Sequence, residues 1–490
     1  MPCGVAAGDV TGDRALIWSR ADRAGRMLVE YATTESFRSS RRRVGPVAGA
    51  ATDFTTTIDL TGLPPGQRIF YRVHYEDPGN RQAASEPVIG SFQTPVAFTG
   101  TPRDLTVLFS ADTCGQGFGI NPDWGGYRLY ETMRRHAPDL FVNSGDTIYA
   151  DQPLQPEVVL EQPEAGPGVW KNVVTDAKSR VAETLADFRG CHAYNFMDDH
   201  LRRFNAEVPL LVQWDDHEVH DNWYPGQMLG DTRYRERRST VLSQRARQAF
   251  LEYTPIRRSR RDPDRIYRNI RYGSLLEIFM LDERSYRGAN STNVQTTQSD
   301  ATAFIGTRQM AWLKQALNAS PATWKIIASD MPLSHVVLHD LAEQPPRYEA
   351  VANGDDGPPK GRELEVAGLL QFMKQQRIRN TLWITADVHY CAAHYYDPAR
   401  ARFTQFDPFW EFVAGPLNAG TAAPPTTLDA TFGPEAKYRK GGRIFGRAPS
   451  EGLQFFGKLK VDARTRALTA SLHDVANETL FSVDLAPEDV

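Results

Sequence analysis

The sequence predicts two domains, a small β-sandwich followed by a larger α/β domain. The chain has 490 residues, which is more than one hydrophobic core usually serves. Residues 1–96 consist of short β-rich runs separated by turns, whereas residues 103–490 alternate strand-like and helical patterns. The segment 94–102, with Pro at both ends, is the expected linker between them.

The composition is that of an ordinary folded protein, with 41% hydrophobic and 24% charged residues. No run of about eighteen apolar residues occurs, so we expect no membrane-spanning helix. A formal net charge of −4 gives no general electrostatic reason to bind nucleic acid. We interpret the basic clusters at 41–43 and 257–265 as solvated surface.

The cysteines and the start of the chain bear on its location. Four cysteines are too few for a disulfide scaffold and form no CxxC pair, although one bridge, between Cys191 and Cys391, remains open. No charged region followed by an apolar segment opens the chain, so either the protein is intracellular or a leader has been removed. The abrupt start before strand-like sequence favours removal.

The first domain is predicted from five β-rich runs at regular spacing. They are residues 14–19, 26–31, 54–60, 69–75 and 88–93. Such runs, without helical patterns between them, are typical of a small β-sandwich. The turn at 62–66 before Tyr71 resembles the corner that precedes a late strand in fibronectin type III-like domains.

The second domain is predicted from strands that alternate with helices, the pattern of parallel βαβ units. Its expected strands are residues 105–109, 140–142, 210–214, 275–281, 324–328 and 381–385. Its expected helices are residues 127–135, 307–317 and 362–375. Residues 151–189 break this pattern, and we interpret them as an insertion near the functional site.

Each of these strands runs directly into polar residues. The polar runs are Asp112 to Cys114, Gly145 to Tyr149, Asp215 to Glu218, Asp282 to Arg284, Asp330, and Asp387 to His389. In an open parallel sheet, ligands bind at this edge. A single Asp after a strand is usually a cap or turn residue, but the pattern repeats at strand after strand. Converging carboxylates repel one another unless cations neutralise them, so the pattern predicts bound metal.

A metal cluster is a suitable catalyst for phosphate esters. Two ions about 4 Å apart can hold the ester, lower the pKa of water and stabilise both in-line oxygens. The sequence has no GxxxxGK[ST] phosphate loop and no GxSxG elbow, which argues against nucleotide-switch and serine-hydrolase mechanisms.

At this point the motifs are familiar. The sequence resembles those of the PhoD-like alkaline phosphatases in four motifs. They are the opening Gly4-Val-Ala-Ala-Gly-Asp-Val, Gly145-Asp-Thr-Ile-Tyr149, Trp214-Asp-Asp-His-Glu-Val and Ala386-Asp-Val-His389. The PhoD-like enzymes are a branch of the calcineurin-like metallophosphoesterases, and the resemblance covers nearly the whole chain. It implies a four-layer α/β/β/α metallophosphoesterase domain after the sandwich.

Several positions depart from the wider superfamily pattern of DxH, GDxxD, GNH[DE], a later His and GHxH. Cys114 and Tyr149 replace a His and an Asp in the first two motifs. Asp216 replaces the Asn, Asp330 stands for the later His, and Asp387 replaces the first His of the last motif. These departures resemble the PhoD-like branch itself.

The resemblance implies two metal pockets that share Asp146. One would take Asp112, Cys114, Tyr149 and His389; the other would take Asp216, Asp330 and Asp387. A thiolate, phenolate and imidazole set suits a transition metal, Fe3+ above all, and carboxylates suit Ca2+. Zinc and manganese are the alternatives. Asp330 has a second interpretation, as a strand end leading into a turn.

Other polar residues near the motifs carry two interpretations each. His217 is expected to donate a proton to the departing oxygen, or else to cap a charged loop. Arg284 is expected to hold phosphate oxygens, or to form a buried salt bridge with Asp282 or Glu283. His335, His394 and Asn222 are candidates to support the ligands. The turn at 415–420 is interpreted as facing the site, and the aromatic segment before it as core.

The sequence therefore predicts a metal-dependent phosphoric ester hydrolase that acts on a small phosphate mono- or diester by attack of a metal-activated water. A phosphodiesterase or a phospholipase D-like enzyme on the same fold is one alternative, because this chemistry does not choose between ester classes. A surface binding protein with a structural metal site is another. The resemblance also implies a periplasmic or secreted protein. The oligomeric state stays open.

Overall fold

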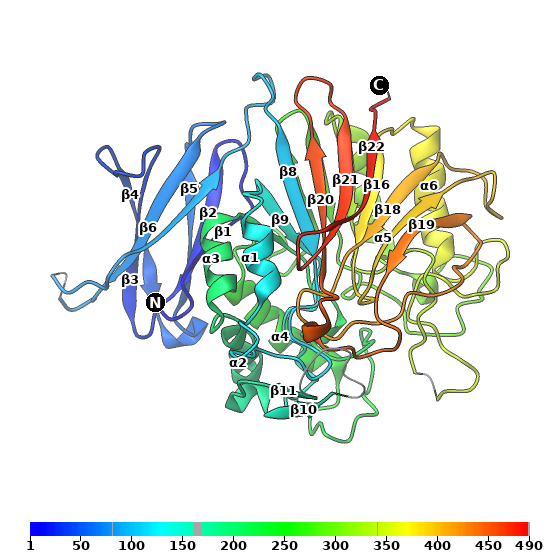
Figure 1. The fold of residues 1–490 in the computed structure, drawn as a ribbon, viewed down its shortest axis with the longest axis horizontal. Coiled ribbons are helices and arrows are strands. Elements are labelled where there is room, and N and C mark those ends of the chain that lie inside the picture. The colour runs from blue at the N-terminus through cyan, green and yellow to red at the C-terminus, as the bar shows by residue number, and fades with distance from the viewer. Residues whose placement is uncertain (81, 161–167, 341, 489–490) are drawn as a thin grey trace.

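The computed structural model of the chain describes residues 1–80, 82–160, 168–340 and 342–488 (Figure 1). The second domain is built on two facing sheets. The first is a nine-stranded sheet in the order β22 (Thr479–Leu485), β21 (Leu468–Asp474), β20 (Phe455–Val461), β8 (Leu105–Ser110), β9 (Leu140–Asn143), β12 (Leu210–Val212), β1 (Val5–Gly8), β2 (Arg14–Arg20) and β5 (Thr55–Thr61).

The second sheet has seven strands. Their order is β13 (Arg268–Tyr272), β14 (Leu276–Met280), β15 (Trp324–Ala328), β16 (Thr381–Thr385), β18 (Phe409–Val413), β17 (Cys391–Tyr396) and β19 (Pro434–Lys440). Strands β14, β15, β16 and β18 pair in parallel. β14, β15 and β18 are apolar runs with little polar alternation, as expected of parallel strands that are covered on both faces.

Helices cover the outer faces of both sheets and complete the predicted four layers. They are α1 (Arg128–Arg134), α2 (Leu185–Asn195), α3 (Asp199–Glu207), α4 (Ser239–Tyr253), α5 (Gly306–Ala319) and α6 (Glu363–Gln375). α1 to α4 pack on the first sheet and α5 and α6 on the second (Figure 1). A third apolar cluster, with Val107, Ile278 and Ile384 among its members, fills the space between the sheets.

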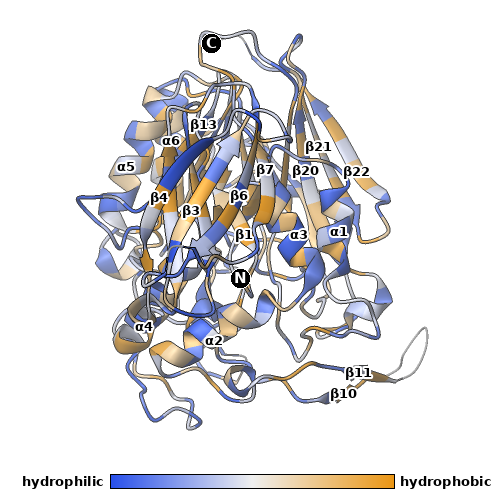
Figure 2. Ribbon diagram, turned by 90° about the vertical axis from the view of Figure 1, so that its left-hand side faces the viewer, coloured by the Kyte–Doolittle hydropathy of each residue, from blue (hydrophilic) through white to orange (hydrophobic). Residues whose placement is uncertain are grey.

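The predicted β-sandwich is present, but its two halves differ in what they join. One half is a separate four-stranded sheet, in the order β4 (Arg41–Ala48), β3 (Gly25–Ala32), β6 (Arg68–Glu76) and β7 (Val88–Gln93). Its edge strand β4 is mainly hydrophilic (Figure 2). The other half consists of β1, β2 and β5, which belong to the nine-stranded sheet.

The two domains therefore share one sheet. β1 pairs in parallel with β12, with Gly8 opposite Leu210, and pairs on its other side with β2. Gly8 also lies against Pro255 so closely that an added Cβ would be 2.5 Å from its ring. After β1, the buried carboxylate of Asp9 accepts hydrogen bonds from the Arg268 guanidinium at 2.8–3.0 Å. This ion pair ties the end of β1 to the start of the second sheet.

The predicted insertion at 151–189 begins with a short hairpin of β10 (Glu157–Val159) and β11 (Val169–Lys171). Residues 161–167 of the predicted insertion lie outside the described part of the chain. The suggested disulfide is wrong, because all four cysteines are free and buried. Cys191 lies in the core between the helices and the first sheet, whereas Cys391 lies in the core between the sheets.

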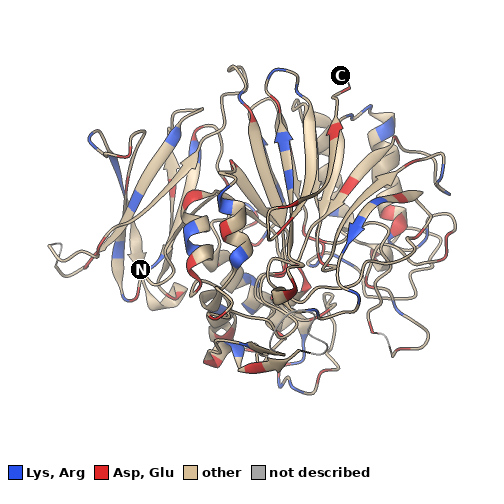
Figure 3. Cartoon of the chain, in the orientation of Figure 1, with Lys and Arg blue, Asp and Glu red and all other residues tan. Residues whose placement is uncertain are grey.

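Acidic and basic residues are interspersed along α1 and α3 (Figure 3). Across the described residues, no helix combines the length and the apolar character needed to cross a membrane. Both observations agree with the composition.

The ion pair between Asp9 and Arg268 gives a prediction about stability. Asp9→Asn leaves the buried guanidinium without its counter-charge, so we expect a loss of about 3 kcal/mol in the free energy of unfolding. Asn tolerates the left-handed backbone at this position, where φ is 43°, so the change removes charge without adding strain.

Urea unfolding followed by tryptophan fluorescence measures this loss. The control is Asp22→Asn, which removes an ion pair with Arg23 in which both side chains are more than half exposed. We expect no measurable change in the control. Equal midpoints for the two variants would contradict the role given to the buried pair.

Candidate metal centre

The predicted ligands lie at the carboxyl ends of parallel strands from both sheets. β8, β9 and β12 of the first sheet lead to Asp112, Asp146 and Asp216. β15 and β16 of the second sheet lead to Asp330 and Asp387. Because the two sheets face each other, these loops meet at one end of the molecule, where open α/β folds bind their ligands.

Three groups of donor atoms form at this point, and within each group the atoms lie within 4.8 Å of one another. The groups are Asp112, Asp146 and His389; Asp146, Asp216 and His217; and Asp146, Asp215, Asp216 and Asp387. Asp146 belongs to all three, so it is the centre of the cluster. The shared role between two metals that the resemblance implies for Asp146 stays a prediction.

The structure brings four residues of the first predicted pocket together. The Tyr149 hydroxyl and Nε2 of His389 lie 2.7 Å apart, beside the carboxylates of Asp112 and Asp146. All four side chains are buried. Burial also lowers the pKa of His389 to about 4, so its imidazole is neutral, the form that binds metals.

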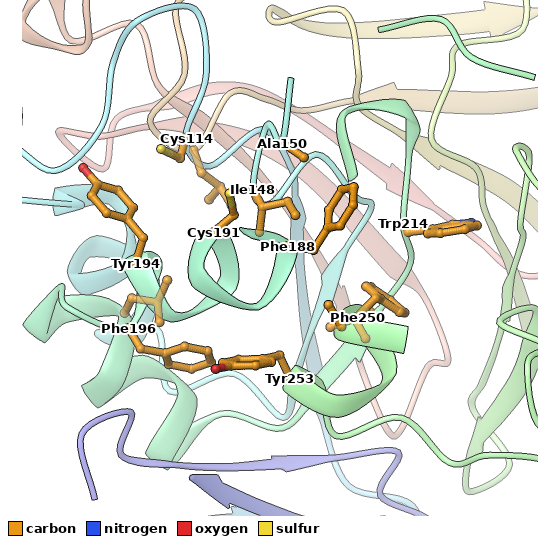
Figure 4. Packing of buried hydrophobic residues seen from close by; sticks show 14 of the residues in the cluster. Cys114, Ile148, Ala150, Phe188, Cys191, Tyr194, Phe196, Trp214, Phe250 and Tyr253 are labelled. Carbon is orange, nitrogen blue, oxygen red and sulfur yellow. The ribbon is translucent and has the colours of Figure 1, made fainter. Parts of the chain in front are cut away.

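Cys114 does not join them, and this departs from the expectation. Its thiol belongs to none of the donor groups found in the described residues. Figure 4 shows it in the hydrophobic cluster with Cys191 and Tyr194. The DxC spacing places both side chains on one side only in an extended chain, but Asp112 has a φ of 65°, which turns the chain.

The second predicted pocket is formed by Asp146, Asp216 and Asp387, with Asp215 as an added member that the sequence did not single out. Asp330 lies beside this group rather than in it. Its Oδ2 is 3.8 Å from Nε of Arg284 and has no hydrogen-bond partner in the described residues. Its role as a ligand stays a prediction.

Backbone strain marks the site. Five of the eight predicted ligands have φ values of 43–65°, in the left-handed region that non-glycine residues seldom adopt. They are Asp112, Asp146, Tyr149, Asp387 and His389. Residues are held in such conformations where the surrounding structure over-determines them, most often at functional sites.

The electrostatics of the cluster call for positive charge. Burial, together with the neighbouring carboxylates of Asp215 and Asp216, raises the pKa of Asp112, Asp146 and Asp387 well above the ordinary value. Both carboxylate oxygens of Asp112 and Oδ2 of Asp146 are buried and have no hydrogen-bond partner in the described residues. Buried oxygens without donors are costly, and cations would satisfy them. The donor set therefore fits bound metal.

His217 is held from both sides. Its Nδ1 lies 2.8 Å from Oδ1 of Asp151, which is buried, and its ring stacks on Tyr149 with a centroid distance of 4.3 Å. Nε2 lies 3.6 Å from Oδ1 of Asp221. Burial lowers the pKa of His217, but the carboxylates of Asp151 and Asp216 outweigh it and raise the pKa well above its ordinary value. The raised pKa favours the protonated imidazole.

Arg284 forms a buried salt bridge, the second of its two interpretations, but with other partners than Asp282 and Glu283. Its Nε donates to Asp215 at 2.5 Å and its Nη1 pairs with Glu349. The side chain is fully buried, and Nη2 lies 4.0 Å from Oδ1 of Asp387. Arg284 therefore orients the carboxylates around the site.

Glu218 positions the loops that carry the cluster, a role that we did not predict from the sequence. Its buried carboxylate accepts the backbone N–H groups of Asp146, Thr147 and Asp215 at 2.6–3.0 Å. It thereby joins the loops after β9 and β12. The donor at Asp215 is local and forms a capping box with Glu218, a pattern visible in the sequence, whereas the donors at Asp146 and Thr147 lie 72 and 71 residues away and come from tertiary folding.

The three remaining candidates differ in whether they contact a predicted ligand. Asn222 supports Asp216 through its backbone N–H, at 2.6 Å from Oδ2. His335 and His394 instead bond to Tyr390 and Glu411, at 2.8 Å each. They belong to a buried polar network beside the site.

The turn at 415–420 does face the site, as expected. The carbonyl of Gly420 lies 2.5 Å from Nδ1 of His389 and fixes the ring. A Cβ at Gly415 would lie 2.1 Å from Oδ2 of Asp112, so only glycine fits there. The aromatic segment before the turn is core, with Phe406, Phe409 and Phe412 buried.

Comparison with known proteins agrees with this geometry. A family model for PhoD-like phosphatases matches residues 108–472, and a model for the N-terminal domain of PhoD-like phosphatases matches residues 1–96. Alkaline phosphatase D of Bacillus subtilis (strain 168) is 26% identical over 410 residues, which cover 79% of this chain and 64% of that protein. The match thus spans less than two thirds of the length of this relative.

Two solved structures share the fold over nearly the whole chain. A structure of PhoD has a TM-score of 0.72 and 20% identity, and covers 100% of this chain and 92% of its own. The purple acid phosphatase PPD1 from seeds of yellow lupin, Lupinus luteus, has a TM-score of 0.62 and 12% identity, and covers 99% and 73%.

The position of Cys114 gives a prediction about metal content. Asp146→Asn should lower the content of both metals, because Asp146 is common to every donor group, and Asp112→Asn should lower one of them. Cys114→Ser is the matched control and should keep the wild-type content. Elemental analysis of the purified variants measures this, and loss of one metal in the Cys114 variant would restore the thiol to the ligand set.

Proposed function

We propose that this chain, which belongs to the PhoD-like phosphatase family, hydrolyses phosphate esters at the candidate metal centre. The observation that carries the proposal is the set of three donor groups that share Asp146, of which two include a histidine and one consists of carboxylates alone. The products would be an alcohol and phosphate from a monoester, or an alcohol and a monoester from a diester. No covalent phosphoenzyme is required.

The donor chemistry supports two unlike metals. Asp112, Asp146, Tyr149 and His389 combine carboxylate, phenol and imidazole, a set that suits Fe3+ or another transition metal. Asp146 with Asp215, Asp216 and Asp387 offers only oxygen atoms, which suits Ca2+. Cations bound there would supply the charge that binds the phosphate and lowers the pKa of the attacking water.

The residues of this chain then have distinct tasks. The fully buried carboxylates of Asp112 and Asp146 would hold the cations that bind the phosphate, and Arg284 and Glu218 position the loops that carry these carboxylates. We assign His217 as the proton donor to the departing oxygen: its Nδ1 is engaged by Asp151, so Nε2, which lies 3.6 Å from Oδ1 of Asp221, is the nitrogen that would donate. Asp151 is a positioning residue that selects the tautomer.

Hydrolysis and its metal dependence test the proposal together. We expect turnover of a chromogenic phosphate monoester or diester at alkaline pH, loss of turnover after treatment with a chelator, and recovery when Fe3+ and Ca2+ are returned. The relative rates rank the two ester classes. Turnover that survives complete metal removal would contradict the mechanism, and zinc or manganese in the active protein would change the metal assignment alone.

A metal-replete protein that is inert on both ester classes would favour the binding-protein alternative. In that case the cluster would be structural: metal removal would lower the melting temperature of a protein that shows no turnover with or without metal. The same samples give both measurements.

Asp151→Asn tests the role of His217. We expect kcat to fall about 10- to 100-fold, because the amide neither fixes the tautomer nor stabilises the imidazolium. KM and metal content should stay near the wild-type values, which separates this effect from loss of the metal centre. A variant with wild-type kcat would remove His217 and Asp151 from the proton-transfer step.

We also propose that the protein acts in the periplasm or outside the cell. The support for this location is the resemblance of the sequence motifs to those of the PhoD-like family. Fractionation of cells that express the full native gene product, followed by detection with an antibody, tests it. Recovery in the cytoplasmic fraction alone would contradict the proposal.

A further inference from the structure

The rim loop, residues 441–447, holds two exposed apolar side chains beside the metal centre. Its sequence is Gly-Gly-Arg-Ile-Phe-Gly-Arg, and Ile444 and Phe445 are 54% and 66% exposed. The two side chains are adjacent in the chain and together form an exposed apolar patch. Nothing in the phosphate chemistry described above uses them.

Both ends of the rim loop are fixed to the protein. The N–H of Gly442 donates to the carbonyl of Ala422 at 2.8 Å. At the other end, Thr421 and Arg447 exchange two backbone hydrogen bonds of 2.9 and 3.1 Å. Arg447 is held further by an ion pair with Glu451 at 2.8 Å. The exposed tip is therefore carried on a fixed base.

That base is the segment that also holds His389. The N–H of Ala422 donates to the carbonyl of His389 at 2.8 Å, and the carbonyl of Gly420 contacts its Nδ1. The ring of Phe445 reaches back over this segment, with its centroid 6.3 Å from that of His389 and an angle of 43° between the planes. Phe445 thus stands next to a member of the donor group, with most of its surface in solvent.

We infer that Phe445 determines substrate specificity by packing against an aromatic or apolar organic group of the phosphate ester. The inference rests on the proposed function, because a phosphate bound by cations that Asp112, Asp146 and His389 would hold has its organic group close to this ring. An aromatic group can stack on the exposed face of Phe445 in the offset or tilted arrangements that rings prefer. A small polar group has no such contact to make.

The test compares phenyl phosphate with glycerol phosphate in the metal-loaded full chain. Phe445→Ala should lower the ratio of their kcat/KM values about tenfold, the size of one aromatic contact. Phe445→Trp should keep the ratio near the wild-type value. Ile444→Ala removes a neighbouring exposed apolar side chain and should change the ratio less than about twofold.

A second measurement separates binding from turnover. Phenylphosphonate and methylphosphonate are not hydrolysed, and we expect Phe445→Ala to weaken inhibition by the phenyl compound about tenfold more than inhibition by the methyl compound. Circular dichroism and thermal melting should match the wild type, since the side chain is largely exposed.

Several results would overturn the inference. Equal losses on both esters in Phe445→Ala would make the residue a support for His389 rather than a determinant of specificity. An equal effect of Ile444→Ala would assign the preference to general apolar surface. Unchanged ratios, with vesicles of phosphatidylglycerol bound by the wild type and not by either Ala variant, would assign the loop to a lipid surface. If the wild type neither hydrolyses an ester nor binds a phosphonate, the proposed function fails as well.

Discussion

The structure depends on one electrostatic constraint, the crowding of buried carboxylates where the two sheets meet. Donor atoms of Asp146, Asp216 and Asp387 lie within 4.8 Å of one another, and Asp112 comes as close to Asp146, in a place from which water is largely excluded. In the absence of cations such a cluster opposes folding, since each negative charge raises the pKa of the next. The left-handed backbone at several of these residues adds to the cost. The fold thus concentrates its strain and its uncompensated charge at one point.

Those features that are local in the sequence were predictable. Strands β14, β15 and β16 are apolar enough to be recognised from their own residues, and the polar run after each strand follows from the parallel order. β1 was not foreseen, because Val5–Gly8 is short, contains mainly Ala and Gly, and becomes a strand by pairing with residues two hundred positions away. β4 was missed because its arginines and Pro46 are untypical of a strand.

The functional site likewise combines residues that a local motif predicts with residues that only the tertiary fold brings together. A motif identified Asp146 and His389, but the partners that orient the functional groups are tertiary and leave no local signature. Asp151 approaches His217 from 66 residues away, and Glu349 approaches Arg284 from 65 residues away. Cys114 differs from the expectation in the other direction, because the family resemblance implied its thiol as a ligand, whereas the side chain lies in the core cluster after the turn at Asp112. A motif match gives the position of a residue along the chain but not the direction of its side chain.

The shared sheet has a consequence for how the chain is made. During synthesis the N-terminal sandwich emerges first, but the outer edge of β1 has no partner until β12, at residues 210–212, has left the ribosome. Until then, the growing chain presents an open strand edge, the kind of surface on which nascent proteins associate wrongly. The first domain is thus continuous in sequence, but its sheet is not complete until the second domain supplies β12. Its last stabilising neighbour arrives only when β12, within the second domain, has been translated.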